Sequence, residues 1–154
     1  MALPHLNEQE RQAFLAEPRV GVLSVASGDA RPPLTVPLWY GYQPGGNLTF
    51  FTGTTGRKAR KTDLIQHAGV VSLCVQHGVF PYKYVTVEGT VVQVDQPPAA
   101  DQMLAIVRRY LPEEAAQAFV KAELDRPSTT LVLFTIRPDR WLTADFSGAQ
   151  GDSV

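Results

Sequence analysis

Hydrophobic and polar residues follow two different periods along this chain, and the change from the helical to the extended period comes near residue 18. Residues 7–17 (NEQERQAFLAE) have the helical pattern, with Asn7 as N-cap, Glu10 three residues later and Pro18 as the stop. Strand-like alternation follows at 19–27, 33–42 and 48–52, joined by the turn-forming stretches SGDARP and QPGGN. The first third of the chain therefore predicts one helix and three strands.

The rest of the chain predicts more strands, with helices inserted between them. Residues 57–68 read as a short helix, 70–76 and 84–95 as strands, and 129–138 and 140–146 as two last strands, the second of them short. Two further helices are predicted from apolar stripes, which are Ala100, Leu104, Val107 and Leu111, and then Ala116, Phe119, Val120 and Leu124.

Two residues refine the strand predictions. Pro37 stands inside a predicted strand and removes a backbone donor, so that strand should lie at an edge, a bulge or a barrel rim. Gly89, in the long strand, indicates a bulge or a sharp bend. Six strands in mostly antiparallel order, with the short stretch 140–146 as a possible addition and with helices between them, predict a β-rich α+β fold. We expect a closed or split β-barrel with peripheral helices, because closure removes exposed sheet edges.

Length and composition limit the class of protein. The 154 residues predict a single domain over 1–154, with loose termini at 1–9 and 147–154. Apolar residues make up 44% and charged residues 19%, with a net charge of -1, which is typical of a globular protein without a broad basic surface for nucleic acid. Cys74 is the single cysteine, so no intrachain disulfide forms, and its apolar surroundings predict a buried thiol. The chain has neither a signal-peptide pattern nor a membrane-length apolar run, so we expect a cytoplasmic protein without a membrane partner.

The usual catalytic and metal-binding motifs are absent from the sequence. His5, His67 and His77 are scattered, no HExxH spacing occurs, and neither a GxSxG elbow nor a Walker A motif is present. We therefore expect no metal and assign no catalytic residue. If the protein is an enzyme, a bound cofactor must carry the difficult chemistry.

The densest positive charge in the chain lies at the start of the predicted helix 57–68. Within FFTGTTGRKARKT, four of five successive positions are cationic, namely Arg57, Lys58, Arg60 and Lys61. Cations oppose the positive end of a helix dipole, and a bound anion would reverse that repulsion. This arrangement predicts either a phosphate pocket or a solvated basic helix start, and charge alone does not decide between them.

The residues just before the cations favour the pocket. Threonines at 52, 54 and 55 add hydroxyl donors, and Gly53 and Gly56 allow the backbone to approach a ligand closely. A strand end, a threonine, a glycine-bearing turn and an Arg–Lys pair then resemble the flavin/deazaflavin split-barrel family, which includes the pyridoxamine 5'-phosphate oxidases. The matching residues are Phe51–Thr52 and Arg57–Lys58. In that family the Arg–Lys pair grips the cofactor phosphate.

The resemblance implies further site residues and a homodimer. The stretch TVPLWY is similar to the family strand that lies against the cofactor ring, which assigns Pro37, Leu38, Trp39 and Tyr40 to ring contacts. The stretch PYKYV is similar to the start of the family's long strand, so Lys83 and Tyr84 would reach the cofactor of the partner subunit. The resemblance thus implies a homodimeric split barrel of six strands, with the cofactor at the subunit interface.

The identity of the cofactor also follows from the resemblance. VPLWY, GRKARK and PYKYV are most similar to the short family members that use the deazaflavin F420, whose acidic tail Arg60 and Lys61 would bind. FMN, which has no such tail, is the alternative. The chain ends without the substrate-binding His of the true oxidases, which argues against vitamin B6 oxidation. The function implied is F420-dependent hydride transfer to an unsaturated small molecule, with an FMN-binding oxidoreductase or a non-catalytic cofactor-binding protein as alternatives.

Several other side chains have two interpretations. Trp39 and Trp141 would either stack on a ligand ring or pack in the core. A tyrosine at 40, 82 or 84 would donate a proton after hydride transfer, unless water does so. Glu88 is expected to face solvent, and Arg137 and Arg140 are expected on the surface.

Overall fold

The computed structural model describes residues 4–54, 57–126 and 130–148, and for Arg57 and Lys58 only the helix backbone. The helices are α1 (Glu8–Ala16), α2 (Arg57–Ala68), α3 (Ala100–Val107) and α4 (Glu113–Leu124). The strands are β1 (Gly21–Val25), β2 (Leu34–Leu38), β3 (Gly41–Tyr42), β4 (Leu48–Gly53), β5 (Val70–His77), β6 (Lys83–Asp95) and β7 (Leu131–Asp145).

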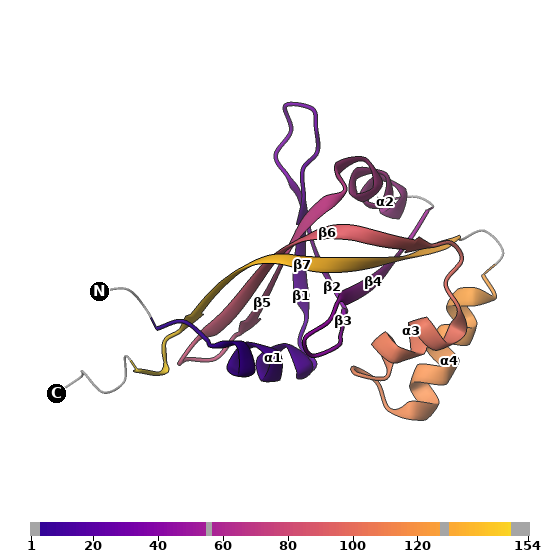
Figure 1. The fold of residues 1–154 in the computed structure, drawn as a ribbon. Coiled ribbons are helices and arrows are strands. Elements are labelled where there is room, and N and C mark those ends of the chain that lie inside the picture. Colours follow the sequence, from indigo (N-terminus) through magenta and orange to yellow (C-terminus); the bar gives the residue numbers. More distant parts are fainter. Residues whose placement is uncertain (1–3, 55–56, 127–129, 149–154) are drawn as a thin grey trace.

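The described strands form one antiparallel sheet that curls on itself. Its order is β2-β1-β5-β6-β7-β4-β3, so β2 and β3 stand at the two ends of the hydrogen-bonded series. Only Trp39 and Tyr40 separate these two strands in the chain. Three Cα steps of about 3.8 Å span at most about 11 Å, so the two edges must converge at this corner. The result is a barrel that is split between β2 and β3 (Figure 1).

The described sheet has one strand more than the predicted six, and its last strand is longer than predicted. The stretch 33–42, predicted as one strand, leaves β1 after Leu38 and pairs with β4 from Gly41 onward, so it forms two strands. The stretches 129–138 and 140–146, predicted as two strands, form the single strand β7 from Leu131. Pro138 does not interrupt β7 because it lies opposite Gly89, where the register between β6 and β7 shifts. The described sheet therefore has seven strands.

Both refinements of the strand predictions are confirmed. The proline-containing strand β2 is an edge strand, and Pro37 is exposed there. Gly89 lies at the register shift, and a Cβ atom at this position would lie 2.8 Å from the Arg137 carbonyl oxygen and would also collide with the Ile136 side chain. Glycine is therefore required at this bulge for lack of space.

The crowding at Gly89 leads to a stability prediction. Gly89→Ala should lower the free energy of unfolding by about 1–3 kcal/mol, because the added methyl group forces the β6–β7 ladder apart. Urea denaturation followed by circular dichroism measures the change. Gly78→Ala is the matched control, since a Cβ atom there meets nothing within 4 Å. Equal stability of the two variants would contradict the crowding argument.

The helices follow the sequence prediction in most respects. α1 begins with the expected capping box, in which the Glu10 amide donates to Asn7 Oδ1 over 2.8 Å. α2 has the predicted bounds, whereas α3 ends at Val107 and not at Leu111. The prediction of a loose segment at 1–9 is wrong for its later part, because Leu6 is buried and its amide donates to the Thr143 hydroxyl.

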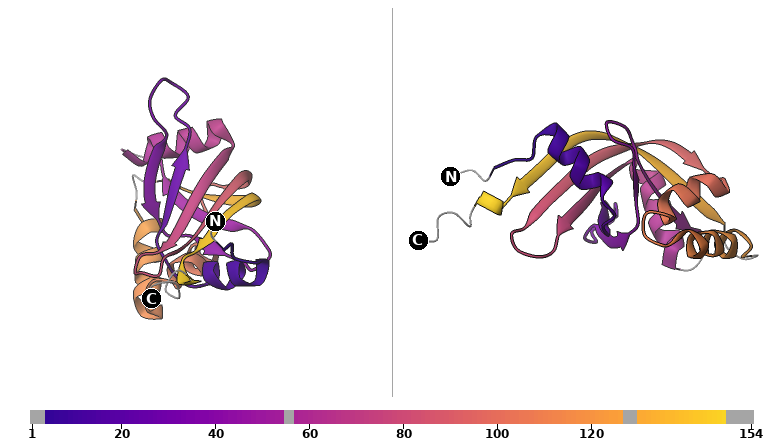
Figure 2. Two further views of the ribbon diagram at one scale, coloured as in Figure 1. Left: turned by 90° about the vertical axis from the view of Figure 1, so that its left-hand side faces the viewer. Right: turned by 90° about the horizontal axis from the view of Figure 1, so that it is seen from below.

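Two hydrophobic cores lie on either side of β7. The barrel core includes Phe14 of α1, Ile65 of α2 and Phe134 of β7. The second core, formed mainly by α3 and α4, includes Val107 and Leu131. α3 and α4 lie side by side and apart from the other two helices (Figures 1 and 2). This division explains why Leu131 to Phe134 are all buried, since both faces of β7 are covered there.

The other face of the barrel wall is less covered. A cross-strand row on this face runs from Pro37 through Val22, Cys74 and Thr86 to Leu142. Pro37 is exposed, Leu142 is 46% exposed and Cys74 is half-buried. The predicted burial of the Cys74 thiol is therefore wrong for a single chain, because its position in the register turns it away from the barrel core.

Candidate functional site

The predicted phosphate pocket corresponds to the corner between β4 and α2. α2 packs against β4 and also contacts β1 and β5, and its Ile65 side chain is fully buried in the barrel core. One turn into the helix, the Thr62 hydroxyl donates to the Gly53 carbonyl oxygen over 2.8 Å and contacts the Thr52 hydroxyl. These buried contacts fix the first turn of α2 directly behind the end of β4.

A second anchor holds the same corner to β7. The amide and the hydroxyl of Thr54 both donate to the Thr130 carbonyl oxygen, each over 3.0 Å. The backbone therefore enters the corner from a defined position. Thr55 and Gly56, predicted to add a donor and a close approach, lie outside the described residues.

The first turn of α2 has the donor chemistry that an anion requires. It contains no acidic residue, although acidic residues are favoured at that position in helices. Arg57 and Lys58 begin the helix, and the half-buried side chains of Arg60 and Lys61 follow within the next turn. The backbone N–H groups of a helix start and these four cationic residues thus belong to the same end of α2, which fits a phosphate group.

The Thr62 contacts can be tested without a ligand. Thr62→Val should lower the free energy of unfolding by about 1–3 kcal/mol, because it leaves the buried Thr52 hydroxyl and Gly53 carbonyl without this partner. Thermal and urea unfolding of the free protein measure the loss. The control is Thr86→Val, which makes the same change at a half-buried strand position. A loss no larger than that of the control would show that the Thr62 hydroxyl does not hold the corner.

The predicted ring-contact segment, Pro37 to Tyr40, lies where the barrel splits. Pro37 is exposed and Leu38 half-buried, so their backbone is accessible along the edge of β2. The Trp39 ring packs in the second core, stacked on Tyr110 with a centroid distance of 4.9 Å and an interplanar angle of 6°. Trp141 packs against the barrel core with the Arg11 guanidinium 4.2 Å above its ring. Core packing is therefore the interpretation that the structure supports for both tryptophans.

Tyr40 does not have the surroundings of a proton donor. Its side chain is fully buried, and its hydroxyl donates to the Leu15 carbonyl oxygen over 3.0 Å. Burial raises the pKa of Tyr40 to about 12, although the nearby Arg109 guanidinium acts in the opposite direction. The hypothesis that the Tyr40 hydroxyl delivers a proton is therefore wrong. A contact between the Tyr40 backbone and the cofactor ring stays a prediction. Tyr82 is 48% exposed and Tyr84 is half-buried, so both stay accessible candidates.

Lys83 and Tyr84 lie far from the ring-contact segment within one chain. Val85, next to them in β6, belongs to the same cross-strand row as Leu38, with β1 and β5 between. Three steps between strands of about 4.8 Å amount to about 14 Å. The Lys83 ammonium lies 3.9 Å from the Asp145 carboxylate. One chain therefore does not bring these two residues to its own pocket, and their contact with a partner's cofactor stays a prediction.

Other predictions concern features away from this corner. Glu88, Arg137 and Arg140 are exposed, as expected. In the part of the chain that the structure describes, no cluster of histidine, cysteine and carboxylate side chains has the arrangement of a metal site. None of the described helices has the length and apolar character needed to cross a bilayer.

Sequence reasoning missed three residues near the candidate site, which are Thr62, Arg109 and Tyr110. Thr62 lies within the predicted basic helix, about one turn after its start. That position was only a weak indication that Thr62 contacts the end of the preceding strand. Arg109 and Tyr110 follow α3, and their contacts are with residues about 70 to 94 positions earlier in the chain. No local pattern predicts contacts at that separation.

The curled sheet, its split and its peripheral helices define a split barrel, and comparison with known proteins identifies its family. The family model described as pyridoxamine 5'-phosphate oxidase matches residues 8–144. The chain therefore belongs to the pyridoxamine 5'-phosphate oxidase family of flavin-binding split barrels. No curated protein matches the sequence.

Solved structures with the same fold come from proteins of several descriptions. An F420 reductase has a TM-score of 0.64 at 24% identity, covering 85% of this chain and 94% of its own. A conserved hypothetical protein from Mycobacterium tuberculosis has a TM-score of 0.71 at 17% identity, with coverage of 97% and 91%. An FAD-binding protein from Mesorhizobium loti has a TM-score of 0.58 at 23% identity, with coverage of 93% and 96%. At these identities the likeness establishes the fold and not the activity.

Proposed function

We propose that the protein is an oxidoreductase that binds F420 with its phosphate at the corner between β4 and α2. The observation that carries the proposal is the first turn of α2, which begins with cations, lacks acidic residues and is held directly behind β4 by Thr62. Family membership supports a cofactor of the flavin type, and the F420 reductase of the same fold supports the deazaflavin.

The chain's own residues have defined tasks in this proposal. Arg57 and Lys58 bind the phosphate, Thr52 and Gly53 form the floor of the corner, and Lys61 binds the acidic tail. The backbone of Pro37 to Tyr40 orients the ring. F420 supplies hydride transfer to an unsaturated small molecule when it is bound, and the protein supplies orientation and electrostatics.

A homodimer completes the site in this proposal. The half-covered row from Pro37 to Leu142 offers apolar surface to a second copy, and Lys83 and Tyr84 then reach the cofactor of the partner subunit. Sedimentation analysis of the free protein tests this arrangement, and a monomer at all concentrations would contradict it.

FMN is the second candidate cofactor, because it carries a phosphate and the family is flavin-binding. A cofactor carrier without catalysis is the third candidate. Absorbance of the purified protein and fluorescence quenching on titration with F420 and FMN distinguish the cofactors. Turnover of reduced F420 with quinones, enones and tetrapyrroles then separates an enzyme from a carrier. Failure to bind either cofactor would contradict the proposal.

A further inference from the structure

The hydroxyl of Tyr110 lies between two strand ends that would otherwise pair with each other. Gly21 and Leu38 form the last pair of the β1–β2 ladder, so two residues further out Arg19 would face Tyr40. Instead of a direct hydrogen bond between these two residues, the Tyr110 hydroxyl bridges them. It donates to the Arg19 carbonyl oxygen over 2.8 Å and accepts a hydrogen bond from the Tyr40 amide over 3.2 Å. A side chain from beyond α3 thus substitutes for a ladder hydrogen bond at the point where the barrel splits.

The ring of Tyr110 holds the same segment by a second contact. It stacks on Trp39 in nearly parallel planes, and Phe119 of α4 lies 5.6 Å from Trp39, measured between ring centroids. Trp39 is therefore oriented by the α3–α4 pair and not by the barrel core.

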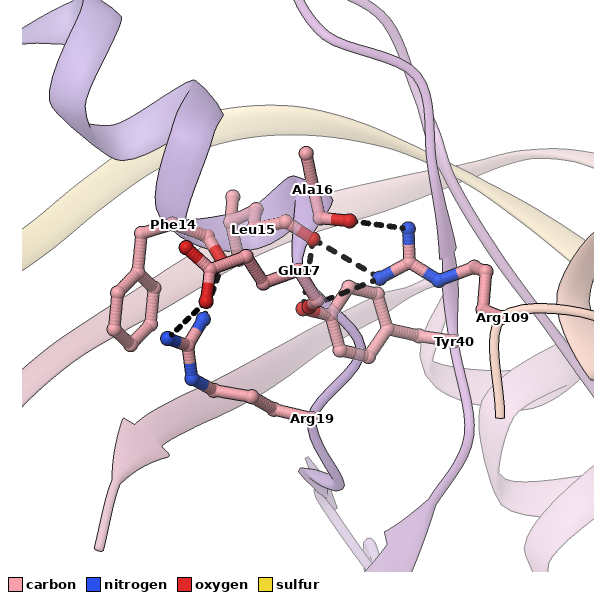
Figure 3. A network of polar contacts seen from close by, with 7 residues as sticks. All are labelled: Phe14, Leu15, Ala16, Glu17, Arg19, Tyr40 and Arg109. Carbon is pink, nitrogen blue, oxygen red and sulfur yellow. Dashed lines mark hydrogen bonds and ion pairs between the residues drawn. The ribbon is translucent and has the colours of Figure 1, made fainter. Parts of the chain in front are cut away.

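The neighbouring residue, Arg109, ties α1 to this junction. Its guanidinium donates to the carbonyl oxygens of Leu15, Ala16 and Glu17 at the end of α1, and it lies 4.8 Å above the Tyr40 ring (Figure 3). The Leu15 carbonyl oxygen also accepts the Tyr40 hydroxyl. Arg109 fixes the Tyr40 side chain, while Tyr110 fixes the backbone that leads to it.

We propose that Tyr110 is a positioning residue, which sets the backbone of Pro37 to Tyr40 at the correct height against the ring of the bound cofactor. This inference rests on the proposed function. Without the hydroxyl, the Tyr40 amide and the Arg19 carbonyl are free to pair directly or with water, and either change moves the edge of β2. A cofactor ring in contact with that edge then experiences a different arrangement of backbone dipoles.

Tyr110→Phe is the appropriate variant, because it removes the hydroxyl and keeps the ring that stacks on Trp39. The matched control is Tyr42→Phe, which removes a hydroxyl that, among the residues the structure describes, accepts a single long bond of 3.4 Å from the exposed Gly45 amide. Three quantities are measured under conditions in which the protein stays folded. They are the rate of hydrogen exchange at the Tyr40 amide, the dissociation constants for F420 and FMN, and the absorption band of the bound cofactor at saturation.

We expect Tyr110→Phe to exchange the Tyr40 amide faster, to bind the cofactor about five- to tenfold more weakly and to shift the band at saturation, while Tyr42→Phe resembles wild type in all three. The band at saturation is decisive, because reduced stability alone changes the amount bound and not the spectrum of the complex. Wild-type affinity and an unshifted band in Tyr110→Phe would overturn the inference. Wild-type protein that binds neither cofactor would overturn the proposed function and this inference with it, and that result is recognised before any variant is compared.

Discussion

The double variant Arg57→Ala/Lys58→Ala is expected to lose about 3–6 kcal/mol of cofactor binding free energy, because each charge-assisted bond to a phosphate contributes about 1.5–3 kcal/mol. Thermal stability of the free protein should hardly change. The two residues begin α2, at the positive end of its dipole, where removing cations relieves repulsion. Fluorescence titration with F420 and FMN measures the affinity, and differential scanning calorimetry measures the stability.

A control with the same change of charge separates local binding from general electrostatics. Arg108→Ala/Lys121→Ala removes one arginine and one lysine, both exposed, from the α3–α4 region. It breaks an ion pair between Arg108 and Glu113, and ion pairs between exposed side chains contribute little to stability. Its cofactor affinity should equal that of wild type. A double variant at the corner that binds both cofactors as well as this control would refute the phosphate assignment.

Local structure was predictable because its causes are local. The capping box of α1 and the bounds of α2 each depend on residues within a few positions of one another. The bulge was indicated by Gly89 itself, although the strand that crowds it lies about 50 residues later. The position of β2 at an edge of the sheet was predicted because Pro37 has no backbone N–H to donate to a neighbouring strand.

The predictions that were wrong depended on distant contacts. Whether 33–42 is one strand or two depends on β4 lying across the split to pair with Gly41, and the sequence around Trp39 carries no sign of that partner. The continuity of β7 past Pro138 depends on Gly89, which lies about 50 residues earlier. The burial of Leu6 depends on Thr143 at the other end of the chain.

The candidate site also has a part that local sequence predicts and a part that depends on distant contacts. The basic start of α2 is visible in the sequence because charge and glycine are concentrated within a few residues. The supports of the site are not visible there, since Thr62 acts on Gly53 through the corner and Tyr110 acts on Tyr40 from about 70 residues away. Side chains that would bind a ligand can thus be predicted from a local concentration of charge and glycine in the sequence. Side chains that hold the backbone of the site in place can be identified only once the fold is known.

The largest effect on stability is expected from truncation of Phe134, at the centre of β7. The side chain is fully buried in the barrel core, with its ring 5.6 Å from that of Phe50. Phe134→Ala should lower the free energy of unfolding by about 3–5 kcal/mol, through lost burial and the cavity left behind. The control is Val94→Ala, which truncates the register partner of Phe134 on β6 at a side chain that is 44% exposed. It should lose less than about 1 kcal/mol.

The same experiment tests whether the two cores unfold together. Trp39 packs with the α3–α4 core and Trp141 against the barrel core, so the single-tryptophan variants Trp141→Phe and Trp39→Phe report on one core each. Because β7 forms a wall of both cores, a cavity at Phe134 should weaken the strand that also carries Leu131 into the second core. We therefore expect Phe134→Ala to shift both fluorescence transitions to the same lower urea concentration. A Trp39 signal that keeps its wild-type midpoint while the Trp141 signal moves would mean that α3 and α4 are stable without the barrel, and that β7 does not couple the two cores.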